Sequence, residues 1–211
     1  MSTFYQDRNF AKADVYRLLS ACYYQPEAAF LDENVFGQLA IALTIAASPS
    51  APEGSRLGDD FRSAGVETLL LDYSRLFLGP FGVLAKPYGS IYLDSGKQVM
   101  DASTIAACEL YQEGGFDVDE SFREAPDHVA VELEFLYLLT HRIATASASG
   151  DMAERDRLAA VKRRFLDGHL GQWVGSFADN VEQGAETAFY RRLASLTCNF
   201  VREDRKESEA A

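Results

Sequence analysis

Residues 66–77 read VETLLLDYSRLF. The apolar side chains of this stretch recur every three or four positions, at Val66, Leu69, Leu70, Tyr73, Leu76 and Phe77. Because an α-helix turns once in about 3.6 residues, this spacing places them on one face that can pack against a core. Gly79 and Pro80 follow shortly afterwards and end the pattern. The stretch therefore predicts an amphipathic helix.

The same period recurs along most of the chain. Apolar stripes with helical spacing run through residues 15–23, 35–46, 99–110, 129–143, 158–165 and 189–200, and a short helix is expected around Trp173 and Phe177. No segment alternates apolar and polar residues as a half-buried strand does. Segments rich in Gly, Pro and Ser, among them 48–58 and 147–150, separate the stripes. We predict an all-α, single-domain bundle of about seven to nine helices over residues 1–202, followed by a disordered charged tail over residues 203–211.

The composition excludes several classes of function. The chain has 211 residues, of which 47% are hydrophobic and 25% charged, as in an ordinary soluble domain. Its net charge of −12 gives no general attraction to nucleic acid or anionic lipid. No apolar run reaches the roughly 18 residues of a membrane span, and the first residues lack the apolar core of a signal peptide. We therefore predict a cytoplasmic protein with no nucleic-acid partner and no stable membrane insertion.

One connection differs from a solvated linker. Residues 79–92 read GPFGVLAKPYGSIY and combine glycines and prolines with large apolar and aromatic residues. So apolar a loop is expected to pack onto the bundle, and ordered loops of this length often carry function. A loop that only covers the core is an equally good interpretation.

A second unusual segment precedes the stripe of residues 129–143. Residues 124–128 read EAPDH. Pro126 suits the first turn of a helix, where its missing N–H is not needed, and Asp127 could cap that helix. His128 could pair with Asp127 or belong to a site. The surrounding residues 109–134 have a local charge of −8. This charge favours a cationic partner but is also compatible with a solvated acidic loop. The one base is Arg123, and the acids are Glu109, Glu113, Asp117, Asp119, Glu120, Glu124, Asp127, Glu132 and Glu134.

The sequence contains no recognisable catalytic motif, whether a nucleophile elbow, a phosphate-binding loop or a dinucleotide fingerprint. His128 and Glu132 lie four residues apart and could supply two metal ligands, with Glu124 and Asp127 nearby. A metal-dependent hydrolase or oxidase is therefore the alternative hypothesis, although the Glu-x-x-His and His-Glu-x-x-His patterns of helical metal sites are missing. We predict that the protein is not an enzyme and has no metal or other cofactor.

Three segments, in their order along the chain, resemble the TorD/DmsD family of redox-enzyme maturation chaperones, which are relatives of the NarJ group. They are residues 73–80 (YSRLFLGP), 87–92 (PYGSIY) and 124–128 (EAPDH), the last followed by Glu132 and Leu133. The resemblance implies a cytoplasmic, all-helical chaperone, monomeric or a domain-swapped dimer. It would bind the twin-arginine signal peptide, and often the body, of the catalytic subunit of a molybdopterin-dependent oxidoreductase. Such chaperones assist cofactor insertion before export by the Tat translocase. Carried over by motif, the signal-peptide-binding residues are Tyr73, Leu76, Phe77, Gly79, Pro80, Ser90, Tyr92, Glu124, Pro126, Asp127 and His128.

The chemistry of such a leader fits these segments. A twin-arginine leader is basic and then apolar, so its receptor needs carboxylates beside a partly exposed apolar surface. Residues 79–92 could supply the apolar surface, and Asp127 could meet the arginines through charge-assisted hydrogen bonds. A third hypothesis is a helical scaffold without a peptide site, in which both segments only cap helices and cover the core.

Overall fold

The computed structural model describes residues 7–79, 82–95, 99–117 and 124–210. Within these ranges every regular element is a helix, which confirms the predicted all-α class. The elements are α1 (Arg8–Cys22), α2 (Ala29–Asp32), α3 (Val35–Ile45), α4 (Ala51–Ala64), α5 (Val66–Tyr73), the π-helical turn η2 (Ser74–Leu78), α6 (Ser90–Leu93), α7 (Ala102–Glu113), α8 (Val129–Ser149), α9 (Met152–Phe165), the π-helical turn η3 (Leu166–Leu170), α10 (Gly171–Gly184) and α11 (Ala188–Ala210). Over the same ranges, no helix is both long enough and apolar enough to cross a bilayer.

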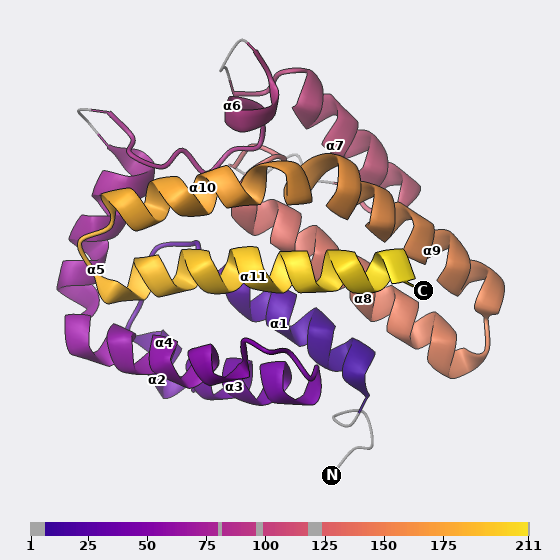
Figure 1. Ribbon diagram of the computed structural model, residues 1–211, viewed down its shortest axis with the longest axis horizontal. Helices are drawn as coiled ribbons and strands as arrows, with labels where there is room; N and C mark the ends of the chain where they lie inside the picture. Colours follow the sequence, from indigo (N-terminus) through magenta and orange to yellow (C-terminus); the bar gives the residue numbers. More distant parts are fainter. Residues whose placement is uncertain (1–6, 80–81, 96–98, 118–123, 211) are drawn as a thin grey trace.

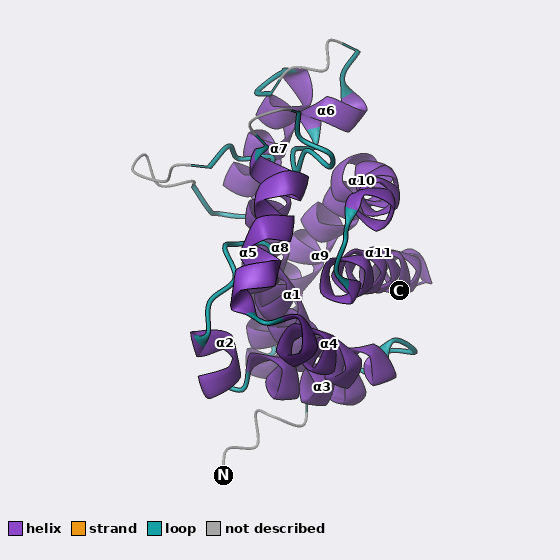
Figure 2. Cartoon of the chain, turned by 90° about the vertical axis from the view of Figure 1, so that its left-hand side faces the viewer, coloured by secondary structure: helices purple, strands orange, loops and turns teal. Residues whose placement is uncertain are grey.

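The long helices pack side by side around one core (Figure 1). Helix α1 lies against α8, α8 against α9, and α10 against α11. Helices α3 and α4 lie at one end of the molecule, and α6 and α7 lie at the other (Figure 2). The rings of Phe36, Phe61 and Phe189, from α3, α4 and α11, have centroids 5.0–5.9 Å apart. These aromatic contacts tie the α3–α4 end to the rest of the bundle.

Helix α4 lies where the sequence pattern predicts a break, so the expectation for residues 48–58 is wrong. Pro52 lies in the first turn of α4, where no hydrogen bond from its nitrogen is required. Gly54 and Gly58 lie against α3: a Cβ atom on Gly54 would be 2.8 Å from the Cα atom of Ala40, and one on Gly58 would be 2.8 Å from the Cβ atom of Phe36. The residues that look like helix breakers are therefore the ones that allow α3 and α4 to pack closely.

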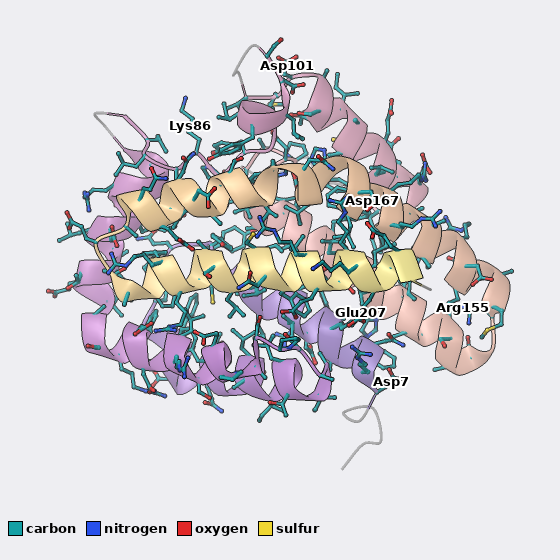
Figure 3. The ribbon with its side chains drawn as sticks, in the orientation of Figure 1. Asp7, Lys86, Asp101, Arg155, Asp167 and Glu207 are labelled. Atoms are coloured by element: carbon teal, nitrogen blue, oxygen red, sulfur yellow. The ribbon has the colours of Figure 1, made fainter. Side chains whose placement is uncertain are left out.

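The charged C-terminal tail is helical rather than disordered, which corrects the prediction for residues 203–211 as far as Ala210. Asp204 is buried and forms ion pairs with Lys12 at 3.0 Å and Lys162 at 2.6 Å. Glu207, labelled in Figure 3, also forms an ion pair with Lys12. These lysines belong to α1 and α9, which are far away in sequence. The sequence of the tail alone therefore does not predict the ion pairs that stabilise its helix.

Candidate functional site

Two segments of the predicted site pair through their backbones. The amide of Val129 donates to the carbonyl of Pro87 at 2.8 Å, and the amide of Gly89 donates to the carbonyl of Asp127 at 2.9 Å. Between these bonds, Tyr88 and His128 form an antiparallel bridge. The connection between η2 and α6, on which Figure 3 labels Lys86, is thereby fixed to the start of α8. The structure thus brings residues 87–92 together with residues 124–128.

Asp127 lies beneath the surface, because its side chain is fully buried. Its Oδ2 atom accepts a hydrogen bond from the amide of Ser90 at 2.8 Å, so it caps α6 and not its own helix α8. Its Oδ1 atom and the Oγ atom of Ser90 are buried without a hydrogen-bond partner among the described residues. The geometry makes Asp127 and Ser90 the support of residues 87–92, with no side-chain surface exposed to a ligand.

His128, and not Asp127, caps α8. Its Nδ1 atom accepts from the amide of Ala130 at 3.2 Å, so Nε2 carries the proton of the neutral ring. Burial lowers the pKa of His128 to about 4, although the nearby charge of Asp127 opposes this shift. The ring stacks on Tyr24 with centroids 6.4 Å apart and meets the edge of Tyr88 at 5.3 Å. A neutral imidazole between two tyrosines therefore forms the floor of the site.

The lowered pKa of His128 predicts a loss of stability in acid. The unfolded chain takes up a proton near pH 6.5 and the folded one near pH 4, so the stabilisation is complete above pH 6.5 and is lost as the pH falls toward 4. When the pH falls from 7.5 to 5, we expect the titration of His128 to lower the free energy of unfolding by about 2 kcal/mol. His128→Asn keeps a helix-capping side chain but cannot titrate, so urea denaturation should show a weaker pH dependence for this variant. His141→Asn, at an exposed histidine, is the control; equal pH dependence in His128→Asn and wild type would contradict the prediction.

A buried polar cluster lies under Gly89. The Nε2 atom of His169 is 2.7 Å from one carboxylate oxygen of Glu132, and the Nε1 atom of Trp173 donates to the other at 3.1 Å. Burial raises the pKa of Glu132. Burial lowers the pKa of His169, but the charge of Glu132, its hydrogen bond and the charges of Asp127 and Asp94 together outweigh this effect and raise it. A Cβ atom on Gly89 would lie 3.0–3.3 Å from Trp173, Glu132 and His169. A larger residue at position 89 would displace this cluster. The cluster therefore sets how closely residues 87–92 approach the core.

Three half-buried tyrosines, the half-buried Glu124 and the exposed Glu134 form the accessible part of the site, which we call the tyrosine–carboxylate surface: Tyr24, Tyr73, Tyr88, Glu124 and Glu134. The hydroxyl of Tyr88 donates to Glu124 at 3.3 Å. Burial raises the pKa of Tyr24 to about 12, and the charges of Glu134 and Glu124 add to the shift. Burial and then Glu124 also raise the pKa of Tyr73. Within the described ranges neither carboxylate forms an ion pair.

The remaining predicted site residues are mostly structural. Leu76 and Phe77 belong to the core, and Gly79 lies so close to Gly82 that a Cβ atom would be 2.7 Å from its carbonyl oxygen. Tyr92 is half-buried and stacks on Trp173 with centroids 5.5 Å apart.

Pro126 lies three residues before Val129, the first residue of α8, instead of starting this helix, and its carbonyl accepts from the hydroxyl of Tyr111 at 2.7 Å. Pro80 lies outside the described residues, as do Asp119, Glu120 and Arg123 of the acidic segment.

Tyr24, Tyr88 and Glu134 belong to the tyrosine–carboxylate surface but are not among the site residues predicted from the sequence, although Tyr88 lies within the motif of residues 87–92. Tyr24 follows α1 and Glu134 lies on α8, and these helices meet only in the folded chain. The alternative metal site is not formed: among the residues that the structure describes, no three His, Cys, Asp or Glu side chains could hold a metal ion. Asp127 instead faces Ser90, and Glu132 faces His169 and Trp173.

Comparisons with known proteins agree with this architecture. Residues 42–179 match the family model described as nitrate reductase delta subunit. The chaperone protein TorD of Vibrio parahaemolyticus is 32% identical over 137 residues, which cover 64% of this chain and 62% of that protein. The TorD of Shewanella sp. (strain MR-4) is 28% identical over 97% of both chains. The crystal structure of a redox enzyme maturation protein from Archaeoglobus fulgidus has the same fold, with a TM-score of 0.51, 22% identity and 93% coverage of each chain. The names of these relatives describe chaperones and maturation proteins, not catalysts.

Proposed function

Since this chain belongs to the nitrate reductase delta subunit family, we propose that it is a cytoplasmic chaperone that binds the twin-arginine signal peptide of a molybdopterin-dependent oxidoreductase. The family membership agrees with the resemblance to the TorD/DmsD and NarJ group, whose members are named chaperones. In this proposal the protein holds the leader, and the body of the enzyme, until the cofactor has been inserted. The enzyme is then released for export.

The observation that carries this proposal is the tyrosine–carboxylate surface. An arginine side chain combines a charge, a flat guanidinium group and five N–H donors. Glu124 and Glu134 can accept charge-assisted hydrogen bonds, while the rings of Tyr24, Tyr73 and Tyr88 offer faces for cation–π contact. The net charge of −12 also draws a basic peptide toward the protein. A pair of adjacent arginines fits this surface in charge, shape and hydrogen bonding.

Removing the charge of Glu124 and Glu134 together is expected to weaken leader binding by about tenfold, because two charge-assisted hydrogen bonds become neutral. The test is a calorimetric titration of the variant Glu124→Gln/Glu134→Gln with leader peptides from molybdoenzymes. Each leader is paired with a peptide in which both arginines are alanine. The difference in leader affinity between the variant and the wild-type protein should become smaller as salt is added, because salt screens the charges of the wild-type protein.

The matched control is Glu67→Gln/Glu109→Gln, which makes the same change in net charge at exposed glutamates on α5 and α7. It is expected to bind the leader as wild type does. If both double variants lose the same affinity, long-range attraction explains the effect and the tyrosine–carboxylate surface is not the binding site. If no leader binds the wild-type protein, the chain is a helical scaffold or recognises only the folded enzyme, and the proposal for the signal peptide fails.

A further inference from the structure

A concave site lies between α1, α3 and α8, away from residues 73–80, 87–92 and 124–128. It encloses about 390 Å³. Its walls include Phe10, Leu18, Ile41, Ala42, Ile45 and His141. Ile41 is 56% exposed although it is a large aliphatic side chain. We call this site the α3 groove. Its volume is typical of sites that bind a ligand, and its lining combines apolar side chains with the polar residues Asp14, Arg17, Gln38 and Thr145.

The α3 groove and the tyrosine–carboxylate surface lie along the same pair of helices. Helices α1 and α8 pack antiparallel: Phe10 meets His141 at 5.2 Å between ring centroids, and Tyr24 meets His128 at 6.4 Å. The first pair belongs to the α3 groove, and the second to the site at the start of α8. Thirteen or fourteen residues separate the two pairs on each helix, so the two sites are about 20 Å apart.

The solvent-facing positions show that both sites lie on one face of this helix pair. On α8, Glu134 and His141 are exposed and lie two helical turns apart, so they share a stripe. On α1, Asp14 and Arg17 line the α3 groove, and Tyr24 lies just beyond the C-terminal end of this helix. A ligand bound at the tyrosine–carboxylate surface can therefore continue along the α1–α8 seam into the α3 groove without crossing the molecule.

The two sites differ in charge. The tyrosine–carboxylate surface presents Glu124 and Glu134 without basic partners among the described residues. The α3 groove is close to neutral, because Val35–Ile45 contains no charged residue and Asp14 and Arg17 pair with each other at 3.2 Å. A complementary occupant is therefore cationic at one end and apolar at the other. An extended peptide covers the separation of about 20 Å with six residues, and a helical one with about thirteen.

We propose that the α3 groove binds the apolar stretch of the peptide whose arginines lie on the tyrosine–carboxylate surface. This inference rests on the proposed function and extends it: one basic-then-apolar segment is held at two places along the α1–α8 seam. Ile41 contacts the apolar stretch directly, and the Asp14–Arg17 pair borders it without adding net charge. The specificity for a basic and then apolar sequence comes from the distance between the two places.

The test replaces Ile41 by glutamine and measures leader binding by calorimetry. Ile41→Gln removes apolar contact area without adding charge, and we expect about tenfold weaker binding that does not depend on salt. Because Ile41 is exposed, the fold should be retained, which circular dichroism checks. The matched control is Ile105→Gln on α7, since Ile105 is 63% exposed; its affinity should equal that of wild type.

Changes in the peptide complete a double-mutant cycle. With a leader whose apolar stretch carries serine in place of leucine, Ile41→Gln should have no further effect. With a leader whose arginines are alanine, Ile41→Gln should still weaken the residual binding.

Other outcomes would overturn the inference and leave the proposed function standing. If Ile41→Gln binds the leader as tightly as the wild-type protein does, the α3 groove does not hold the apolar stretch. If Leu84→Gln weakens binding instead, the apolar stretch lies at Leu84, which is 47% exposed and near η2. A dimer that sediments as a monomer after Ile41→Gln would make the α3 groove a contact between two copies of this chain. Absence of leader binding by the wild-type protein would instead refute the proposed function itself.

Discussion

Replacing Glu132 by alanine is expected to lower the free energy of unfolding by about 3–5 kcal/mol, as when one partner of a buried ion pair is removed. Both carboxylate oxygens have a partner, His169 at 2.7 Å and Trp173 at 3.1 Å. Without them the indole N–H has no acceptor and the imidazole has no counter-charge in the core. Urea denaturation followed by fluorescence measures the loss, and Trp173, the only tryptophan of the chain, reports from the site of the change.

Glu134→Ala is the matched control, because Glu134 lies two residues further along α8 and is exposed. It should change the free energy of unfolding by no more than about 0.5 kcal/mol. The two glutamates are expected to differ also in function, since Glu134 belongs to the tyrosine–carboxylate surface and Glu132 supports Gly89 from below. Equal stability losses in the two variants would contradict the buried cluster.

Local periodicity was sufficient to predict the fold class but not every helix. The apolar stripe from Val66 to Phe77 lies in α5 and η2. It could be predicted because amphipathic spacing depends only on residues that are close in sequence. Helix α4 could not be predicted in this way, since Gly54 and Gly58 are favourable only when α3 lies against them. The end of α11 was missed for the same reason: the partners of Asp204 and Glu207 are in α1 and α9.

The sequence identifies two segments of the candidate site that lie together in the structure. The motifs with Tyr88 and with Asp127-His128 do come together, because their backbones pair. The sequence did not show which side chains face the solvent: Asp127 is buried, whereas Tyr24 and Glu134 are accessible. Motif matching finds residues that maintain a local structure as readily as residues that contact a ligand. The two groups are separated here by tertiary packing: residues 87–92 cover Asp127, and the packing of α1 on α8 brings Tyr24 near Glu134.

Replacing Asp127 by alanine is expected to lower the free energy of unfolding by about 2–3 kcal/mol, because the buried amide of Ser90 loses its acceptor and α6 loses its cap. Leader binding should also fall more than tenfold, since residues 87–92 carry Tyr88 and depend on this hydrogen bond for their position. Urea denaturation and calorimetric titration of the same preparation measure the two effects.

Asp127→Asn distinguishes a supporting role from direct contact with the leader. Asparagine keeps an oxygen that can accept from the amide of Ser90 but has no charge. If Asp127 acts by holding residues 87–92, Asp127→Asn should recover most of the stability and most of the leader affinity together. If its charge met the leader arginines, the variant would be stable and yet bind as weakly as Asp127→Ala. We expect the first result, because a carboxylate with no exposed surface can reach an arginine of the leader only if residues 87–92 move away from α8.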